Sequence, residues 1–85
     1  MGRRNHLVRM RITKIMSDGQ WRTAKEVGEL MASKNWSYTS IQQIGNLLSN
    51  TPGYARRRST DRLTYNLGIY RLENEATFKK WMSEG

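Results

Sequence analysis

The sequence predicts a small α+β protein in which three helices precede a two-stranded β-hairpin and a short C-terminal helix. Two observations lead to this class. Apolar residues recur with helical spacing in three segments before Pro52, as amphipathic helices require. After Pro52, the β-favouring stretch 54–72 is interrupted by Ser-Thr-Asp, which is typical of a hairpin. The 85 residues leave room for one domain with a modest core.

The first helix is expected at about Asn5–Ser17. Its apolar residues are spaced i, i+4, i+7 and i+8, and they are Val8, Ile12, Ile15 and Met16. The segment Ser-Asp-Gly then ends the helix, with Gly19 placed to adopt the left-handed cap conformation. Residues 1–6, which include Arg3 and Arg4, are expected to form a flexible basic arm.

Two capping boxes mark the next two helices. Thr23 and Glu26 open a helix that runs to about Ala32, and Thr39 with Gln42 opens a second one over residues 39–49. The apolar face of this second helix consists of Ile41, Ile44 and Leu48, with Leu47 at its edge. The opposite face carries no charge and consists of amides and hydroxyls, which both donate and accept hydrogen bonds: Thr39, Gln42, Gln43, Asn46 and Asn50.

The hairpin is expected to pair Tyr54–Arg58 with about Asn66–Leu72. Its loop is either tight at Ser59–Asp61 or a longer arm that reaches Tyr65, and Gly68 is a candidate for a bulge. Residues 73–85 hold a short helix capped by Asn74. The apolar edge of this helix (Phe78, Trp81 and Met82) either closes the core or pairs two chains. The tryptophans Trp21 and Trp36 are also expected in the core.

The positive charge is unevenly distributed. The net charge is +8, and the excess lies in residues 1–16, with five basic residues and no acid, and in residues 54–72, with five basic residues and one acid. Clustering of this kind indicates a surface that binds a polyanion. A basic edge strand that merely resists aggregation is the simpler alternative, but it leaves the basic N-terminal segment unexplained.

Several function classes are not expected. The chain lacks cysteine, a long apolar run and an apolar signal core after its basic start, which predicts a soluble cytoplasmic protein with no membrane partner. It has one histidine, His6, scattered acids, an isolated Gly45 in place of a phosphate loop, and no metal-ligand spacing. We therefore expect no enzymatic activity, no cofactor or metal, and no small-molecule ligand.

The order of elements resembles the winged helix-turn-helix family over residues 7–72. The matching stretches are TAKEVGELM for the first helix of the motif, YTSIQQIGNLL for the second, and GYARRRSTDRLTYNLGIYRL for the wing. One departure is the turn SKNWSY, which is longer than the three or four residues of the simplest motif. The resemblance implies a three-helix core with a β-hairpin wing, followed by the C-terminal helix.

The resemblance also implies a function, namely sequence-specific binding of double-stranded DNA by a small transcriptional regulator. The helix 39–49 would lie in the major groove, where amides and hydroxyls contact base edges. The base-reading residues would be Thr39, Ser40, Gln42, Gln43 and Asn46. A homodimer would double the recognised half-sites. The alternative for these five side chains is that they are merely solvated.

The wing would contact the DNA backbone or the minor groove through Arg56, Arg57, Arg58 and Arg62, because guanidinium groups match phosphate oxygens. Strand alternation places Arg56 and Arg58 on one face of the hairpin and Arg57 on the other. Two other functions remain open. One is a winged helix that binds RNA or single strands through Tyr54, Tyr65 and Tyr70, and the other is a protein-interaction subunit of a larger complex.

Overall fold

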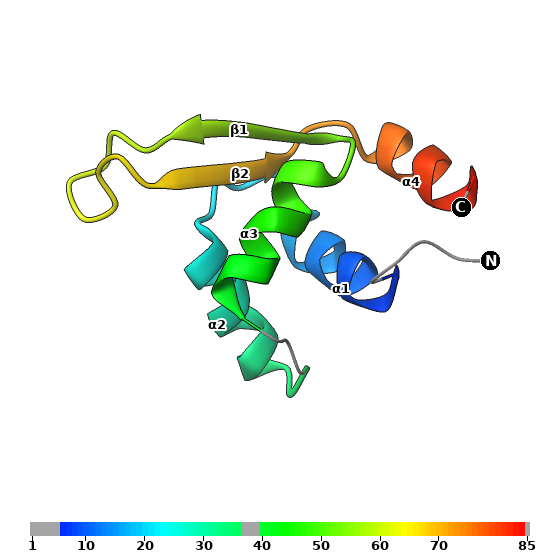
Figure 1. The fold of residues 1–85 in the computed structure, drawn as a ribbon, viewed down its shortest axis with the longest axis horizontal. Coiled ribbons are helices and arrows are strands. Elements are labelled where there is room, and N and C mark those ends of the chain that lie inside the picture. Colours follow the sequence, from blue (N-terminus) through cyan, green and yellow to red (C-terminus); the bar gives the residue numbers. More distant parts are fainter. Residues whose placement is uncertain (1–5, 37–39, 85) are drawn as a thin grey trace.

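The computed structural model describes residues 6–36 and 40–84, which form four helices and one two-stranded antiparallel sheet (Figure 1). The α+β class and the order of elements are confirmed. In chain order the elements are α1 (His6–Met16), α2 (Ala24–Ser33), α3 (Ile41–Asn50), β1 (Tyr54–Arg58), β2 (Gly68–Leu72) and α4 (Glu75–Glu84). Within the described residues, no helix combines the length and the apolar character that crossing a membrane requires. The expected basic arm lies almost wholly outside them.

Three helix ends form as the sequence predicts. The hydroxyl of Thr23 accepts the Glu26 amide at 3.1 Å, and the Glu26 carboxylate accepts the Thr23 amide at 3.0 Å. Gly19 has a φ of +74° and donates its amide to the Met16 carbonyl. The side chain of Asn74 accepts the Thr77 amide at the start of α4. Each cap satisfies backbone groups that the helix itself leaves unpaired.

The turn after α2 is longer than in the simplest motif because it contains a complete C-terminal cap. Asn35 has a φ of +58° and donates its amide to the Ala32 carbonyl, while Trp36 donates its amide to the Met31 carbonyl, both at 3.0 Å. This pair of bonds is a Schellman motif, with asparagine in the left-handed position that glycine usually occupies. It directs Trp36 back against the core.

The hairpin is regular, and its loop is the longer of the two alternatives. Tyr54 pairs with Leu72 and Arg58 pairs with Gly68, with every intervening pair in register. The expected bulge at Gly68 is therefore wrong. The strand β2 also begins at Gly68 and not at Asn66, because residues 59–67 form a loop closed by their own hydrogen bonds. We call residues 59–67 the hairpin loop.

The short segment between α1 and α2 pairs with the outer edge of β2. The Arg22 amide donates to the Tyr70 carbonyl at 2.9 Å, and the Tyr70 amide donates to the Arg22 carbonyl at 2.8 Å. The Arg22 guanidinium forms two 2.7 Å bonds to Asp18. Hydrogen bonding by Arg22, with help from the Gln20 amide, lowers the pKa of Asp18 to about 2.

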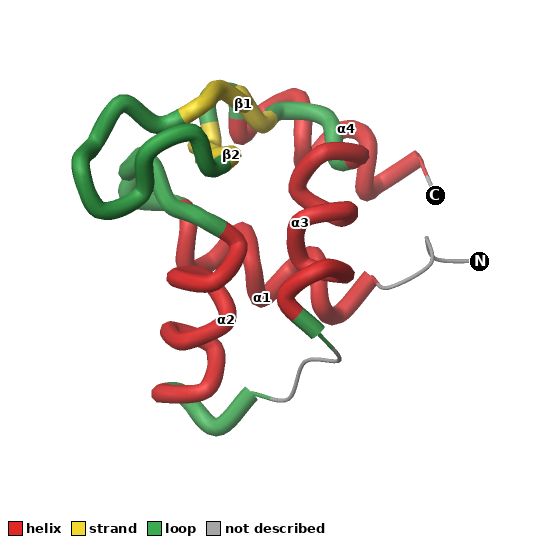
Figure 2. The backbone as a smooth tube through the Cα atoms, turned by 60° about the vertical axis from the view of Figure 1, so that its left-hand side comes forward, coloured by secondary structure: helices red, strands yellow, loops and turns green. Residues whose placement is uncertain are grey.

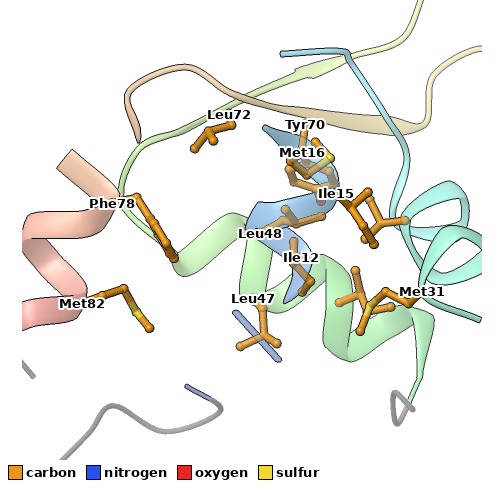
Figure 3. Packing of buried hydrophobic residues seen from close by; sticks show 12 residues of the cluster. Ile12, Ile15, Met16, Met31, Leu47, Leu48, Tyr70, Leu72, Phe78 and Met82 are labelled. Carbon is orange, nitrogen blue, oxygen red and sulfur yellow. The ribbon is translucent and has the colours of Figure 1, made fainter. Parts of the chain in front are cut away.

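One core joins all the elements. Figures 1 and 2 show α1, α2 and α3 gathered on one side of the hairpin, and α4 beyond the end of the hairpin opposite its loop. Phe78 and Met82 are buried against the rest, so α4 packs on the core of its own chain (Figure 3). The other members come from three helices and β2: Ile12, Ile15, Met16, Val27, Met31, Ile44, Leu47, Leu48, Tyr70 and Leu72.

Of the large aromatic residues expected in the core, Phe78 is buried in it, Trp36 and Trp81 pack against it while partly exposed, and Trp21 is not among its members. Trp21, Trp36 and Trp81 are each only half-buried, and a cation lies over each ring. The nearest are Arg57 on Trp21 at 4.4 Å, Arg9 on Trp81 at 4.9 Å, and Arg11 and Lys34 on Trp36 at 5.5 Å. The rings therefore lie at the rim of the core, where they pair with basic residues.

Candidate nucleic-acid interface

The helix α3 begins one residue later than the sequence suggests. Ser40, not Thr39, is the N-cap, and its hydroxyl oxygen accepts the Gln43 amide at 3.0 Å. The expected capping box of Thr39 and Gln42 is therefore wrong. Thr39, the first of the expected base-reading residues, lies outside the described residues. Ser40 keeps its hydroxyl proton as a donor while its oxygen caps the helix.

The outer face of α3 is polar and uncharged, as expected. Gln42 and Asn46 are exposed and lie four residues apart, so they share one face of the helix. Gln43 is half-buried at the flank of this face. The structure thus brings together Ser40, Gln42, Gln43 and Asn46 on one helix, with Gln42 and Asn46 the most accessible pair.

The apolar face of α3 differs from the expected one. Ile44 and Leu48 are buried, but the third buried residue is Leu47, and Ile41 is 45% exposed. Residues 44, 47 and 48 lie i, i+3 and i+4, which makes the tightest apolar stripe on a helix. Ile41 precedes this stripe by one turn and instead faces an open groove.

The hairpin contacts the edge of α3 through Tyr70. The Ser49 hydroxyl donates to the Tyr70 hydroxyl at 3.4 Å, and a side chain at Gly45 would lie 3.8 Å from the same oxygen. Tyr70 is 7% exposed and pairs with Arg56 across the strands. Sequence reasoning missed this contact, because nothing local in the sequence links residue 49 to residue 70.

The basic triplet of β1 is split between the two faces of the hairpin, which confirms the strand argument. The Arg56 guanidinium lies 5.9 Å from the centre of the Tyr70 ring, on the α3 side. Arg57 lies on the other face, 4.4 Å from the centre of the Trp21 ring. Arg58 donates to the Asn66 carbonyl and side-chain oxygens at 3.2 and 3.3 Å. Only Arg56 and Arg58 therefore share the face that meets α3.

Four of the five arginines in residues 54–72 form no ion pair with an acid of the described residues. Among residues 6–36 and 40–84, the ion pairs are Arg22 with Asp18, Arg71 with Glu73, and Lys79 with Glu75. Arg56, Arg57, Arg58 and Arg62 are exposed and take part in none of them. An exposed cation without an acidic neighbour can attract an anion over several ångströms.

The arginines of α1 are used differently. Arg9 covers the Trp81 ring and donates its Nε–H to the Thr51 hydroxyl at 3.1 Å, and Arg11 covers the Trp36 ring. Both side chains are half-buried. Part of the positive charge near the N-terminus therefore has a structural role, which the sequence alone did not reveal.

An open groove separates α3 from the hairpin loop. Its volume is about 540 Å³. Ile41 lines it from α3, Lys25 and Glu29 line it from α2, and Arg56 lines it from β1. Leu63 and Leu67 of the hairpin loop close the far side. The helix α3, through Ile41, and one arginine of the hairpin thus border the same concave surface.

Among residues 6–36 and 40–84, no three His, Asp or Glu side chains are grouped so that they could hold a metal ion. Comparison of the chain with protein-family models, with curated proteins and with solved structures finds no match.

Proposed function

We propose that this protein binds double-stranded DNA as a winged helix and acts as a small transcriptional regulator. The helix α3 occupies the major groove, and the hairpin is the wing, on the backbone or in the minor groove. The observation that carries this proposal is that α3, whose exposed side chains Gln42 and Asn46 are polar and uncharged, borders through Ile41 the same groove as Arg56, which forms no ion pair with the described acids. Amides read base edges, and guanidinium groups hold phosphates.

The backbone contribution is tested by a salt series on duplex binding. A protein that neutralises phosphates loses affinity linearly in log–log form, with a slope of about −0.9 for each phosphate contact. We expect measurable binding at low salt and a negative slope. Undetectable binding at low salt, or an affinity that does not change with salt concentration, would falsify the proposal.

The base-reading role is tested by selecting bound sequences from a random duplex library. Gln42→Ala should relax the preference at one base pair by about 1–3 kcal/mol. Gln20→Ala is the matched control, because Gln20 is exposed on the segment between α1 and α2, away from α3. A Gln42→Ala variant that weakened every sequence equally would show that α3 does not read bases. The selected sequences would also show paired half-sites if two copies bind.

The single-strand alternative receives less support from the hairpin tyrosines. Tyr70 is 7% exposed and presents no ring face on which an unpaired base could stack. Tyr54 is half-buried, with its hydroxyl bonded to Thr13 at 2.7 Å and its ring packed against Phe78. Tyr65 is the one hairpin tyrosine that is exposed, at 72%. Competition between duplex DNA, single-stranded DNA and RNA separates the two functions. We expect the duplex to compete best.

A further inference from the structure

The hairpin loop is held in one conformation by its own hydrogen bonds. The Ser59 amide donates to the Leu67 carbonyl at 2.8 Å, and the Asn66 amide donates to the Ser59 carbonyl at 2.9 Å. Inside the loop, the Ser59 and Thr64 hydroxyls are 2.7 Å apart. The Asp61 carboxylate accepts the Leu63 amide at 2.9 Å. Leu63 therefore projects from a fixed turn and not from a freely moving segment.

The hairpin loop exposes apolar side chains although two of its polar side chains are used to hold the loop together. Ser59 is only 5% exposed, and both the Ser59 hydroxyl and the Asp61 carboxylate are bonded to backbone amides, while Thr60, Arg62 and Asn66 remain exposed. Its apolar groups are turned outward, with Leu63 92% and Leu67 53% exposed. One exposed leucine needs no explanation, but an ordered loop that presents its apolar side chains to water indicates a contact surface.

The charges beside the loop indicate what that surface contacts. Arg58 and Arg62 lie on either side of the Ser59–Asp61 segment and form no ion pair with an acid in the described ranges. The nearest acid in sequence, Asp61, already accepts the Leu63 amide. These charges fit a polyanion that can also accept an apolar side chain. The minor groove of duplex DNA has both properties, because apolar wedges enter between its base pairs and kink the duplex.

We propose that Leu63 is such a wedge, inserting between two base pairs of the minor groove while Arg58 and Arg62 hold the flanking phosphates. The inference rests on the proposed binding of duplex DNA and adds to it that the protein bends its site. The kink should fall at a flexible pyrimidine–purine step, since these steps unstack most easily.

The experiment measures affinity and bending on the same molecules. Short duplexes with one central TA step carry a fluorophore at each end, and energy transfer between the ends reports the bend. For the unaltered protein we expect a bend of about 20–90°, the range that apolar wedges produce. Leu63→Ala should abolish most of this bend and weaken binding about tenfold, because a buried leucine is exchanged for a methyl group.

Three variants serve as controls. Leu63→Met keeps a long apolar side chain and should keep the bend. Leu7→Ala removes another exposed leucine, 58% exposed on α1, and should change neither bend nor affinity. Tyr65→Ala should keep the bend, because Tyr65, 72% exposed, projects less than Leu63, 92% exposed. Thermal unfolding of each variant confirms that the fold is retained, as expected for exposed positions.

The outcomes separate this inference from the proposed function. Binding to a duplex that stays straight, or a bend that survives Leu63→Ala, would overturn the wedge and leave DNA binding intact. A bend lost only with Tyr65→Ala would also overturn it. If Leu63→Ala left the bend unchanged but reduced the number of copies bound per duplex, Leu63 would contact a second protein and the wedge would be wrong. Absence of any duplex binding would reject both proposals.

Discussion

The two ends of the hairpin are built on opposite principles. At the end opposite the loop, which lies beside α4 and which we call the α4 end, Tyr54 and Leu72 face the core. There the Gly53 carbonyl accepts the amides of Glu73 and Asn74 at 2.9 and 3.0 Å. At the loop end, the polar groups are satisfied internally and Leu63 faces water. Folding accounts for the first arrangement, because Leu72 is buried in the core and Tyr54 packs against it. It does not account for the second, where Leu63 stays exposed.

The comparison is sharpest between two leucines on the same hairpin. Leu72 is 8% exposed and Leu63 is 92% exposed. Leu72→Ala should lower the free energy of unfolding by about 2–5 kcal/mol, the usual range for a buried leucine. Leu63→Ala should change it by less than about 0.5 kcal/mol. Chemical denaturation measures both, and a large loss at Leu63 would mean that the loop end also supports the fold.

Two glycines with positive φ test how tightly the α4 end of the hairpin is packed. Gly19 has nothing within 4 Å of the position of an added Cβ, whereas at Gly53 this atom would lie 2.6 Å from the Asn74 carbonyl oxygen. Gly19→Ala should cost about 1–2 kcal/mol from backbone conformation alone. Gly53→Ala should cost a further 1–3 kcal/mol or so, because the backbone of α4 must shift.

Thermal unfolding of the two glycine variants at one pH makes this comparison directly. Equal losses would show that the added methyl group at position 53 is accommodated without further cost, and the end of the hairpin beside α4 would then be less tightly packed than its geometry indicates.

Adjacent arginines in the middle of the hairpin separate binding from folding. Arg56 borders the groove beside α3, and Arg57 covers Trp21 on the opposite face. Arg56→Ala should reduce the salt slope of duplex binding by about 0.9 and the affinity about tenfold. Arg57→Ala should leave the slope unchanged and cost roughly 0.5–1 kcal/mol of stability through the lost cation–π contact. The reverse result would place DNA on the Trp21 face.

The smallest expected effect concerns Tyr54 at the α4 end of the hairpin. Removing its hydroxyl, which is bonded to Thr13, should cost about 1 kcal/mol at neutral pH. Burial raises the pKa of Tyr54 to about 12, although the bond to Thr13 opposes this shift. Because the folded pKa is the higher one, this stability is complete below pH 10 and is lost as the pH rises toward 12.

Unfolding free energies of the unaltered protein and Tyr54→Phe, measured from pH 7 to 12, check the sign. The difference between them should shrink or reverse above pH 10. A constant difference across this range would show that burial of the Tyr54 phenol does not raise its pKa.

The sequence by itself determined the features that depend on neighbours along the chain. The cap of Thr23 and Glu26, the left-handed Gly19 and the cap of Asn74 are all local hydrogen-bond patterns, and they form as expected. Strand alternation is equally local, which is why the separation of Arg57 from Arg56 could be predicted without coordinates.

Only the tertiary structure decided features that join distant parts of the chain. Three such features depend on how the elements pack. They are the backbone pairing of Arg22 with Tyr70, the burial of Leu47 while Ile41 stays exposed, and the cation–π contact of Arg9 with Trp81. The exposure of Leu63 belongs to this group, because an apolar residue in a loop can turn inward or outward. Here the hydrogen bonds of Ser59 and Asp61 occupy the inside of the turn, and the leucine is left facing outward.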